Sequence, residues 1–187
     1  MTSLDSTSAP TLPLRPGKWT VDMFHSEVGF TIRHLGVSKV RGRFTQFEAD
    51  VQIGETAEST SVTATIQLAS IDTGNADRDA HVLAPDMVDV TLRPTLAFRS
   101  TSVSGEGDEW RLDGDLTIGE VTVPVQLEVE LGGVEVFPAD GRQHAGFEAT
   151  TQIRRQDFGL MPAIPSAMLG DVIKIELDLQ LVEPGSD

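Results

Sequence analysis

The stretch 121-VTVPVQLEVEL-131 places an apolar residue at every second position, and 173-IKIELDLQL-181 repeats the pattern near the end of the chain. Successive side chains of a strand point to opposite faces of a sheet, so a period of two predicts strands with one buried face. A parallel sheet covered by helices would instead show continuous apolar runs. The alternation therefore predicts an antiparallel sheet that is wetted on one side.

Further segments share this period and bring the expected number of strands to about eight, which can close into a barrel. Their inward sets are Ser26, Val28, Phe30 and Ile32; Phe47, Ala49, Val51 and Ile53; Val62, Ala64, Ile66 and Leu68; Leu96 and Phe98; Trp110, Leu112, Gly114, Leu116 and Ile118; and Phe147, Ala149 and Ile153. Glycine-containing stretches between the segments predict turns at residues 54–55, 104–108, 119–120, 132–133 and 140–141. The interior of such a barrel is either packed by its own side chains or holds one small ligand, and the periodicity leaves both open.

Two segments interrupt the strand pattern. Residues 75–90 predict a short helix with Asn75 as its N-cap and with Val82, Leu83 and Met87 facing the barrel. Residues 159–170 contain two prolines and little polarity, and predict an irregular loop. The Ser/Thr/Pro-rich residues 1–17 predict a flexible leader, 18–183 a single domain and 184–187 a tail.

Composition narrows the function classes. The chain of 187 residues has 14 Lys and Arg against 29 Asp and Glu, a formal charge of −15, which argues against nucleic acid and against anionic lipid surfaces as partners. The absence of cysteine excludes disulfides, thiolate nucleophiles and cysteine-ligated metals. No run approaches the roughly 18 apolar residues of a membrane-spanning helix, and no signal-peptide pattern precedes residue 19, so the expected location is the cytoplasm.

One part of this acidic chain is basic. Residues 33–43 carry Arg33, Lys39, Arg41 and Arg43 and no acidic residue. Guanidinium and ammonium groups in such a cluster can neutralise an anionic head group, although charge runs are more often solvated faces. Arg154 and its neighbour Arg155 are candidates to add to the cluster.

Polar side chains also occupy positions where the pattern asks for apolar ones. The parity of residues 26–34 points both Ser26 and His34 inward, at opposite ends of one strand. Arg78, Asp79 and His81 cluster in the predicted helix. These groups either tie the helix to the mouth of the barrel or form a polar collar that orients a ligand head group. Asp79 and His81 also suggest an acid–base pair, whereas the four histidines match no metal-ligand spacing, so no metal site is expected.

In order and spacing, these motifs resemble the YceI-like family over nearly the whole chain, from Trp19 to about Leu181. The matching pieces are WTVDMFHSEVGF from Trp19, RHLGVSKVRGRF from Arg33, SIDTGNADRDAHVL from Ser70, DVTLRP from Asp89, FRST from Phe98, GDLTI from Gly114, VTVPV from Val121 and DFG from Asp157. The chain departs from the family pattern at Met87-Val88, where an aromatic pair is usual, and at Arg154, where asparagine is common. Many relatives of this family are periplasmic.

The resemblance implies an all-β, extended lipocalin-like antiparallel barrel that binds a long-chain amphiphilic lipid without catalysis. It implies a polyisoprenoid, quinone or fatty-acid-like partner and no cofactor other than that lipid; homodimerisation stays open. The residues we expect to line the ligand tunnel are Ser26, Val28, Phe30, Ile32, Phe47, Ile66, Phe98, Leu116 and Phe147. The residues we expect at the head group are His34, Arg41, Arg78, Asp79, His81 and Arg154. The alternative is an enzyme that acts on a small hydrophobic or lipid substrate with His81 and Asp79 as its acid–base pair.

Overall fold

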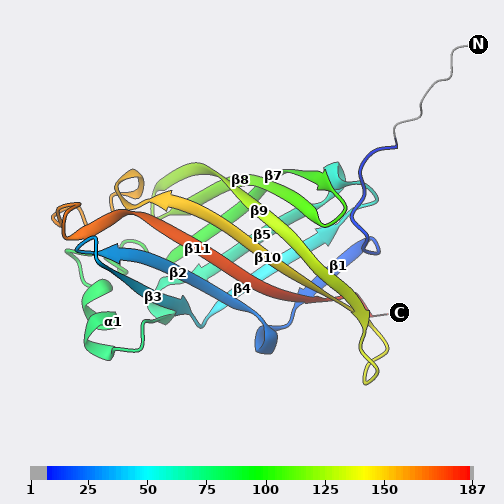
Figure 1. Ribbon diagram of the computed structural model, residues 1–187, viewed down its shortest axis with the longest axis horizontal. Helices are drawn as coiled ribbons and strands as arrows, with labels where there is room; N and C mark the ends of the chain where they lie inside the picture. The colour runs from blue at the N-terminus through cyan, green and yellow to red at the C-terminus, as the bar shows by residue number, and fades with distance from the viewer. Residues whose placement is uncertain (1–7, 186–187) are drawn as a thin grey trace, which may run out of the picture.

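The chain forms one antiparallel sheet that wraps into an elongated barrel (Figure 1). The structure, a computed structural model, describes residues 8–185. The strands are β1 (Gly17–Val21), β2 (Glu27–His34), β3 (Ser38–Phe44), β4 (Phe47–Ile53), β5 (Ser61–Gln67), β6 (Ile71–Asp72), β7 (Thr95–Glu106), β8 (Glu109–Ile118), β9 (Val121–Val136), β10 (Gln143–Arg154) and β11 (Leu169–Val182). Helix α1 (Ala76–Val82) and 3-10 helices at Met23–His25, Ala57–Ser59, Leu68–Ser70 and Arg155–Phe158 complete the described elements.

A single strand pairing closes the barrel. The sheet order is β1-β4-β5-β7-β8-β9-β10-β11-β2-β3-β6, and β1 pairs in addition with β11 through Thr20↔Val182 and Val21↔Leu181. β1 therefore lies against the C-terminal end of β11, while β2 pairs along the rest of the same edge. The predicted all-β antiparallel barrel is confirmed: β1, β4, β5 and β7 to β11 close it, and β2, β3 and β6 extend it.

Glycines account for two differences between the predicted and the observed strands. Residues 132–133 do not form a turn: β9 continues to Val136, and the pairing jumps from Phe147↔Leu131 to Gly146↔Gly133, which leaves Gly132 as a bulge. Gly133 adopts a φ of 151°, which suits glycine and lets the strand bend without ending. β3 is absent from the predicted strands, because Gly42 occupies one of its inward positions and hides the apolar period.

The helical insertion is shorter than expected. The Asn75 side chain accepts the Arg78 backbone N–H at 3.0 Å, so the predicted N-cap is confirmed. The helix ends at Val82 rather than near Val90, and residues 83–94 continue as turns that lie across the end of the barrel. Val82 and Met87 pack into the core as predicted. Together with residues 155–168, this segment forms what we call the plug loops, at the left end of Figure 1.

Two apolar cores fill the two ends of the barrel. The core at the plug end includes Met87, Val88, Phe158, Leu160 and Met161 together with side chains of β2, β5, β7, β8 and β10. The other core surrounds Trp19, which is fully buried, and contains Leu14 and partly buried Leu12. Residues 12 and 14 are thus packed, which differs from the flexible leader expected over 1–17; residues 1–7 of that leader lie outside the described part.

Candidate functional site

An apolar cavity of about 150 Å³ lies inside the barrel. Its wall is apolar apart from Thr60 and Arg111. Among the side chains of this wall are Ala49, Ala64, Phe98, Phe147, Ala149 and Leu177. A cavity of this size with aliphatic and aromatic walls stays dry and accepts small apolar molecules. The cavity shares Val51, Ile53 and Leu181 with the core around Trp19, so the interior is packed at the plug end and hollow from its middle toward the Trp19 end.

The predicted tunnel residues divide between this cavity and the cores. Phe98 and Phe147 line the cavity. Val28, Phe47, Ile66 and Leu116 pack in the core at the plug end, and Ile32 is buried. Phe30 stacks on Phe44 with ring centroids 5.5 Å apart, and the Ser26 hydroxyl accepts the Gln180 backbone N–H at 3.0 Å. Their contact with a ligand stays a prediction.

Phe98 forms part of the partition between the cavity and the plug-end core. It borders both, as does Leu177. Its ring fits because β8 has a glycine beneath it: a Cβ atom at Gly114 would lie 2.4 Å from the ring carbons. A glycine inside a strand often marks such a close approach. Two side chains, Phe98 and Leu177, thus form the partition between the cavity and this core.

Arg155 holds one plug loop in place. Its side chain is 1% exposed and donates to four backbone carbonyls: Met161 at 2.6 Å, Ile164 at 2.8 Å, and Leu169 and Gly170 at 3.2 Å. A carboxylate oxygen of Asp171 lies 3.1 Å from its Nη2 atom. A planar guanidinium with five donors suits this task, because the carbonyls of Met161 and Ile164 lie in a loop and those of Leu169 and Gly170 lie at the irregular start of β11.

The two plug loops are also joined to each other. The Met161 N–H donates to the Met87 carbonyl at 3.0 Å, and Arg93 donates to the carbonyls of Val88 at 3.0 Å and Gly159 at 3.5 Å. These contacts couple the loop after α1 to the loop between β10 and β11. Met87 and Met161, the two methionines that face the core here, have flexible side chains that adapt to irregular space.

The residues expected at a ligand head group all lie toward the end of the barrel that carries α1 and the β2–β3 turn (Figure 1). Arg78 donates to the hydroxyl and carbonyl of Thr73, both at 2.8 Å, and the Thr73 hydroxyl donates to Asp79 at 2.6 Å. This arrangement ties α1 to the segment after β6, which is the structural alternative. His81 is exposed, and among residues 8–185 no side-chain hydrogen bond or ion pair links this group to His34, Arg41 or Arg154.

The prediction that the His34 side chain points into the barrel interior is wrong, because this side chain is exposed. Its parity matches that of Ile32, but β2 reaches past the end of the packed core and the imidazole is exposed. Arg41 and Arg154 are exposed as well. None of the six lines the apolar cavity. Their role toward a head group stays a prediction.

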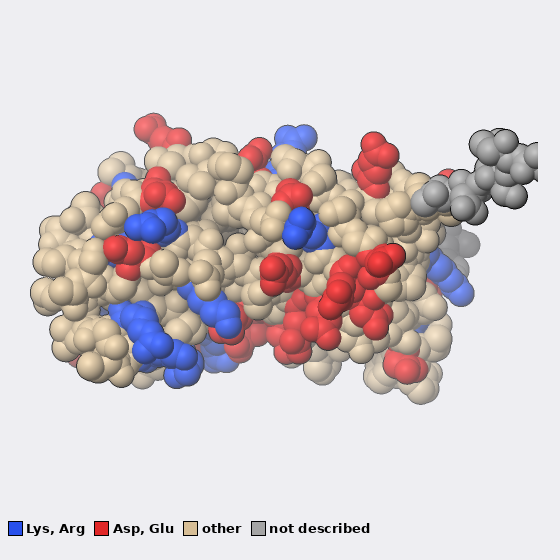
Figure 2. Space-filling view, turned by 45° about the horizontal axis from the view of Figure 1, so that its top comes forward, with Lys and Arg blue, Asp and Glu red and all other residues tan. Residues whose placement is uncertain are grey.

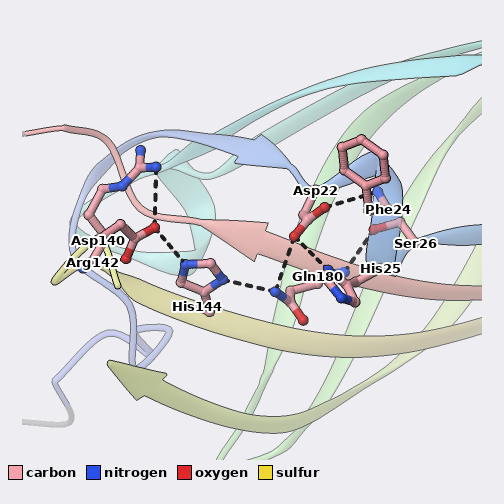
Figure 3. Close-up of polar contacts among 8 residues, drawn as sticks. All are labelled: Asp22, Phe24, His25, Ser26, Asp140, Arg142, His144 and Gln180. Atoms are coloured by element: carbon pink, nitrogen blue, oxygen red, sulfur yellow. Dashed lines mark hydrogen bonds and ion pairs between the residues drawn. The ribbon is translucent and has the colours of Figure 1, made fainter. Parts of the chain in front are cut away.

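A chain of polar side chains that the sequence did not indicate crosses the closing seam of the barrel (Figure 3). Gln180 on β11 donates through Nε2 to Nδ1 of His144 at 2.8 Å and to Asp22 at 3.3 Å. Nε2 of His144 lies 3.1 Å from Asp140. Nδ1 of His25 lies 2.8 Å from the same Oδ2 atom of Asp22, and the Phe24 backbone N–H donates to Oδ1 at 2.9 Å. The chain joins β10 and β11 to the segment after β1, where strand pairing is short.

Two carboxylates at the ends of this chain are stabilised in their charged form. The hydrogen bond from His25 is the largest cause that lowers the pKa of Asp22, followed among the lowering causes by the Phe24 backbone N–H. For Asp140, the Arg142 backbone N–H is the largest cause of a lowered pKa, and the hydrogen bond with His144 adds to it. Their ordered hydrogen bonds indicate a clamp on the seam.

The described part of the chain holds neither a cluster of metal-ligating side chains nor a long helix. Across residues 8–185, no group of three or more His, Asp or Glu side chains is placed to hold a metal ion. The one α-helix in that range has seven residues, and no helix there is long and apolar enough to span a membrane.

A sequence signal for the buried Arg155 exists. The inward parity of Phe147, Ala149 and Ile153, continued by one step, points Arg155 inward and Arg154 outward, although a 3-10 helix begins at Arg155.

Sequence comparison finds relatives among bacterial proteins. Protein YceI of Shigella flexneri is 40% identical over 137 residues, which cover 73% of this chain and 71% of that protein. Protein YceI of Escherichia coli O157:H7 is 39% identical over the same length and shares of the two chains.

Three solved structures share the fold. BcnA of Burkholderia cenocepacia has a TM-score of 0.75 at 22% identity and covers 86% of this chain and 98% of its own. The Campylobacter jejuni YCEI protein has a TM-score of 0.74 at 27% identity, over 82% and 91%. A polyisoprenoid-binding domain from Saccharophagus degradans, implicated in plant cell wall breakdown, has a TM-score of 0.63 at 14% identity, over 91% and 100%. At their low identities, BcnA and the Saccharophagus domain inform on the fold alone.

The family match covers the whole barrel. Residues 19–181 match the YceI-like domain, from the buried Trp19 on β1 to Leu181 in the closing pair with Val21. The matched range contains the cavity's partition, both plug loops and the polar chain across the seam. The chain therefore belongs to the YceI-like domain family.

Proposed function

We propose that the barrel binds a long-chain lipid of the polyisoprenoid, isoprenoid-quinone or fatty-acid-like class, with the tail in its interior, and carries or stores it without chemical conversion. The observation that carries the proposal is the apolar cavity enclosed by the barrel. The Saccharophagus degradans domain that shares this fold is a polyisoprenoid-binding domain, and we carry that ligand class over as part of the proposal. A site of this kind gains affinity from apolar burial, at about 0.8 kcal/mol per CH₂ group before the cost of ordering the chain.

The tail needs more room than the cavity offers. Pockets that hold drug-sized ligands measure about 300–1,000 Å³, and this cavity measures about 150 Å³. A route for widening exists, because only two side chains of the cavity wall, Phe98 and Leu177, also pack in the plug-end core. Rotation of Phe98 and rearrangement of Met87 and Met161 would join the cavity to the space under the plug loops.

The alternative of an acid–base enzyme gains no support from the geometry. Asp79 and His81 are two residues apart on α1, so their side chains do not share a face. The Asp79 carboxylate accepts the N–H and hydroxyl of Thr73, at 3.0 and 2.6 Å. A carboxylate held by these donors supports the fold of the insertion rather than the orientation of His81.

A cavity-filling substitution tests the proposal. Ala64 lines the cavity, and its Cα partners on the two neighbouring strands, Ala49 and Phe98, line it as well. Ala64→Leu therefore extends a larger side chain from this wall into the cavity. We expect delipidated wild type to take up polyprenyl alcohols, measured by native mass spectrometry, and Ala64→Leu to lose at least about tenfold in affinity. Ala80→Leu places the same side chain on an exposed position of α1 and should bind like wild type.

The milder Ala64→Val guards against an unfolding artefact, and circular dichroism checks that each variant remains folded. Equal uptake by wild type and a folded Ala64→Leu would place the ligand elsewhere. Absence of uptake by wild type would remove the proposed function.

A further inference from the structure

Exposed apolar side chains gather at the end of the barrel that carries the plug loops. Val37 is 81% exposed, and Leu35 and Met168 are each 52% exposed. The Leu35 N–H donates to the Met168 carbonyl at 2.9 Å, which fastens the β2–β3 turn to the plug loop before β11. We call Leu35, Val37 and Met168 the apolar tip.

The backbone conformation of the tip does not favour a leucine at position 35. Leu35 and Gly36 have φ values of 53° and 68°, and the Val37 N–H donates to the His34 carbonyl at 3.2 Å. A turn with two positive φ values favours Asn-Gly, whereas a leucine side chain is strained there. Neither burial nor local conformation favours Leu35, so the side chain has a use outside the isolated fold.

Cations surround the tip. Arg33 and Lys39 are Cα partners on β2 and β3, each two residues from a tip residue, and Arg154 lies opposite exposed Val172 on the neighbouring strands. A fourth cation, Arg41, lies on β3. We call these four residues the basic rim: Arg33, Lys39, Arg41 and Arg154. Within residues 8–185 these four have no ion-pair partner, whereas Arg43 is paired with Glu27 and Asp72.

Acidic side chains gather elsewhere. Glu109, Glu130, Glu148, Asp178 and Glu27 are successive Cα partners across β8, β9, β10, β11 and β2 and form a carboxylate row. Figure 2 shows basic groups toward the end that bears β2, β3 and α1, and acidic groups toward the middle. Six strand residues separate Glu27 from Arg33, or about 20 Å. At physiological salt the Debye length is about 8 Å, so the row barely weakens the field at Arg33 and its partner Lys39. Arg41 lies nearer to the row, because it lines one hollow with Glu27, Glu148 and Asp178.

We propose that this end of the barrel docks on an anionic phospholipid bilayer, with the apolar tip inserted and the basic rim at the phosphate level. Two strand residues span about 7 Å, which matches the roughly 5–10 Å depth of apolar side chains at a membrane interface. The rim supplies charge complementarity, and the carboxylate row is held away from the surface. The inference goes beyond lipid binding in the interior and stands without it.

Vesicle co-sedimentation provides the test. The full chain should bind vesicles of equal parts phosphatidylglycerol and phosphatidylcholine and should not bind phosphatidylcholine vesicles. Raising the salt from about 0.1 to about 1 M shortens the Debye length from about 10 to about 3 Å and should release the protein. Equal binding to both kinds of vesicle, or no binding to either, would overturn the proposal.

Variants assign the binding to the two parts of the surface. Leu35→Asn suits the turn, so it should bind vesicles about tenfold less while resisting unfolding at least as well as wild type. Arg33→Gln with Lys39→Gln should lower binding about 25-fold, because each cation contributes about five-fold near an anionic surface. Lys18→Gln with Arg99→Gln removes the same charge from other strands and should leave binding close to that of wild type.

Two outcomes distinguish membrane docking from tail binding in the interior and from self-association. Ala64→Leu should still bind vesicles while losing uptake of polyprenyl alcohol, so failure of one proposal is distinguishable from failure of the other. A Leu35→Asn variant that changes the oligomeric state in sedimentation velocity, without changing vesicle binding, would mean that the tip meets a second copy of the chain and would overturn membrane docking.

Discussion

At the scale of single residues, Arg155 shows how one side chain can organise a segment without regular structure. Its guanidinium supplies the partners of four carbonyls in and beside the plug loop, and it is nearly inaccessible to water. A buried polar group without its partner costs more than the hydrogen bond contributes net. The loop therefore depends on the charge and on the fork geometry of this residue.

We predict that Arg155→Met destabilises the protein by about 3–5 kcal/mol, because the loop carbonyls and Asp171 lose a buried charged partner. Arg154→Met, at the exposed neighbour, should change stability by less than about 0.5 kcal/mol. Urea unfolding followed by tryptophan fluorescence measures both. Similar effects of the two substitutions would mean that Arg155 does not hold the loop.

The same pair shows how far the strand period reaches. Ile153 is buried, so one further step of the period points Arg155 inward and Arg154 outward, as observed. The period does not predict the carbonyls that Arg155 binds, because Met161 and Ile164 lie in a loop without regular structure. Phe98 and Phe147, in contrast, follow an unbroken period of two, and both line the cavity.

At the scale of elements, the closing seam has few strand pairs. β1 and β11 share Thr20↔Val182 and Val21↔Leu181, and beyond this point the Asp22 N–H donates to the Gln180 carbonyl at 2.8 Å. Side chains then continue the connection, from Asp22 through Gln180 to His144 (Figure 3). The clamp thus extends a short ladder by polar contacts.

We predict that the seam weakens in acid. The folded pKa of Asp22 lies below its ordinary value of 3.8, so its contribution is fully present above that pH and is lost as the pH falls through the folded pKa. Asp22→Asn should therefore lower the midpoint of thermal unfolding at neutral pH, and the difference from wild type should shrink below about pH 4. Asp86→Asn, on an exposed turn, is the control. A difference that stays constant with pH would contradict the clamp.

The period of two predicted the bounds of a strand well where apolar residues alternate with polar ones along its whole length. β4 has the bounds that the alternation predicts, Phe47–Ile53. The period failed at glycines, which can serve a turn, a bulge or a close approach: Gly132 gives a bulge, and Gly42 makes room for the Phe30 ring, 2.4 Å from a Cβ atom placed there. Only the neighbouring strand decides among these uses, and that neighbour is distant in sequence.

At the scale of the whole molecule, the net charge of −15 hides a strongly uneven distribution. The carboxylate row aligns five acidic side chains across five neighbouring strands, and like charges directly opposite one another destabilise a sheet. The basic rim comes from β2 and β3 of the extension and from Arg154 at the end of β10. The sequence revealed the basic segment, but not the row, because its five members come from five separate strands.

We predict that Glu148→Lys stabilises the protein by about 1 kcal/mol, because Glu148 lies between Glu130 and Asp178. Glu48→Lys makes the same charge change opposite Thr65 and should have a smaller effect. Added salt should stabilise wild type more than Glu148→Lys. Salt screens the repulsion among the carboxylates of wild type, whereas the substitution has already removed that repulsion. Equal effects of the two substitutions in urea unfolding would show that overall charge, not the row, determines stability.

The central claim is that the barrel interior holds a lipid tail, and native mass spectrometry of protein purified without detergent tests it most directly. We predict a species heavier than the 20.1 kDa polypeptide, from which organic extraction releases an apolar molecule. After extraction, added polyprenyl alcohol should restore a heavier species. The bare polypeptide mass before extraction, with no uptake afterwards, would contradict the claim.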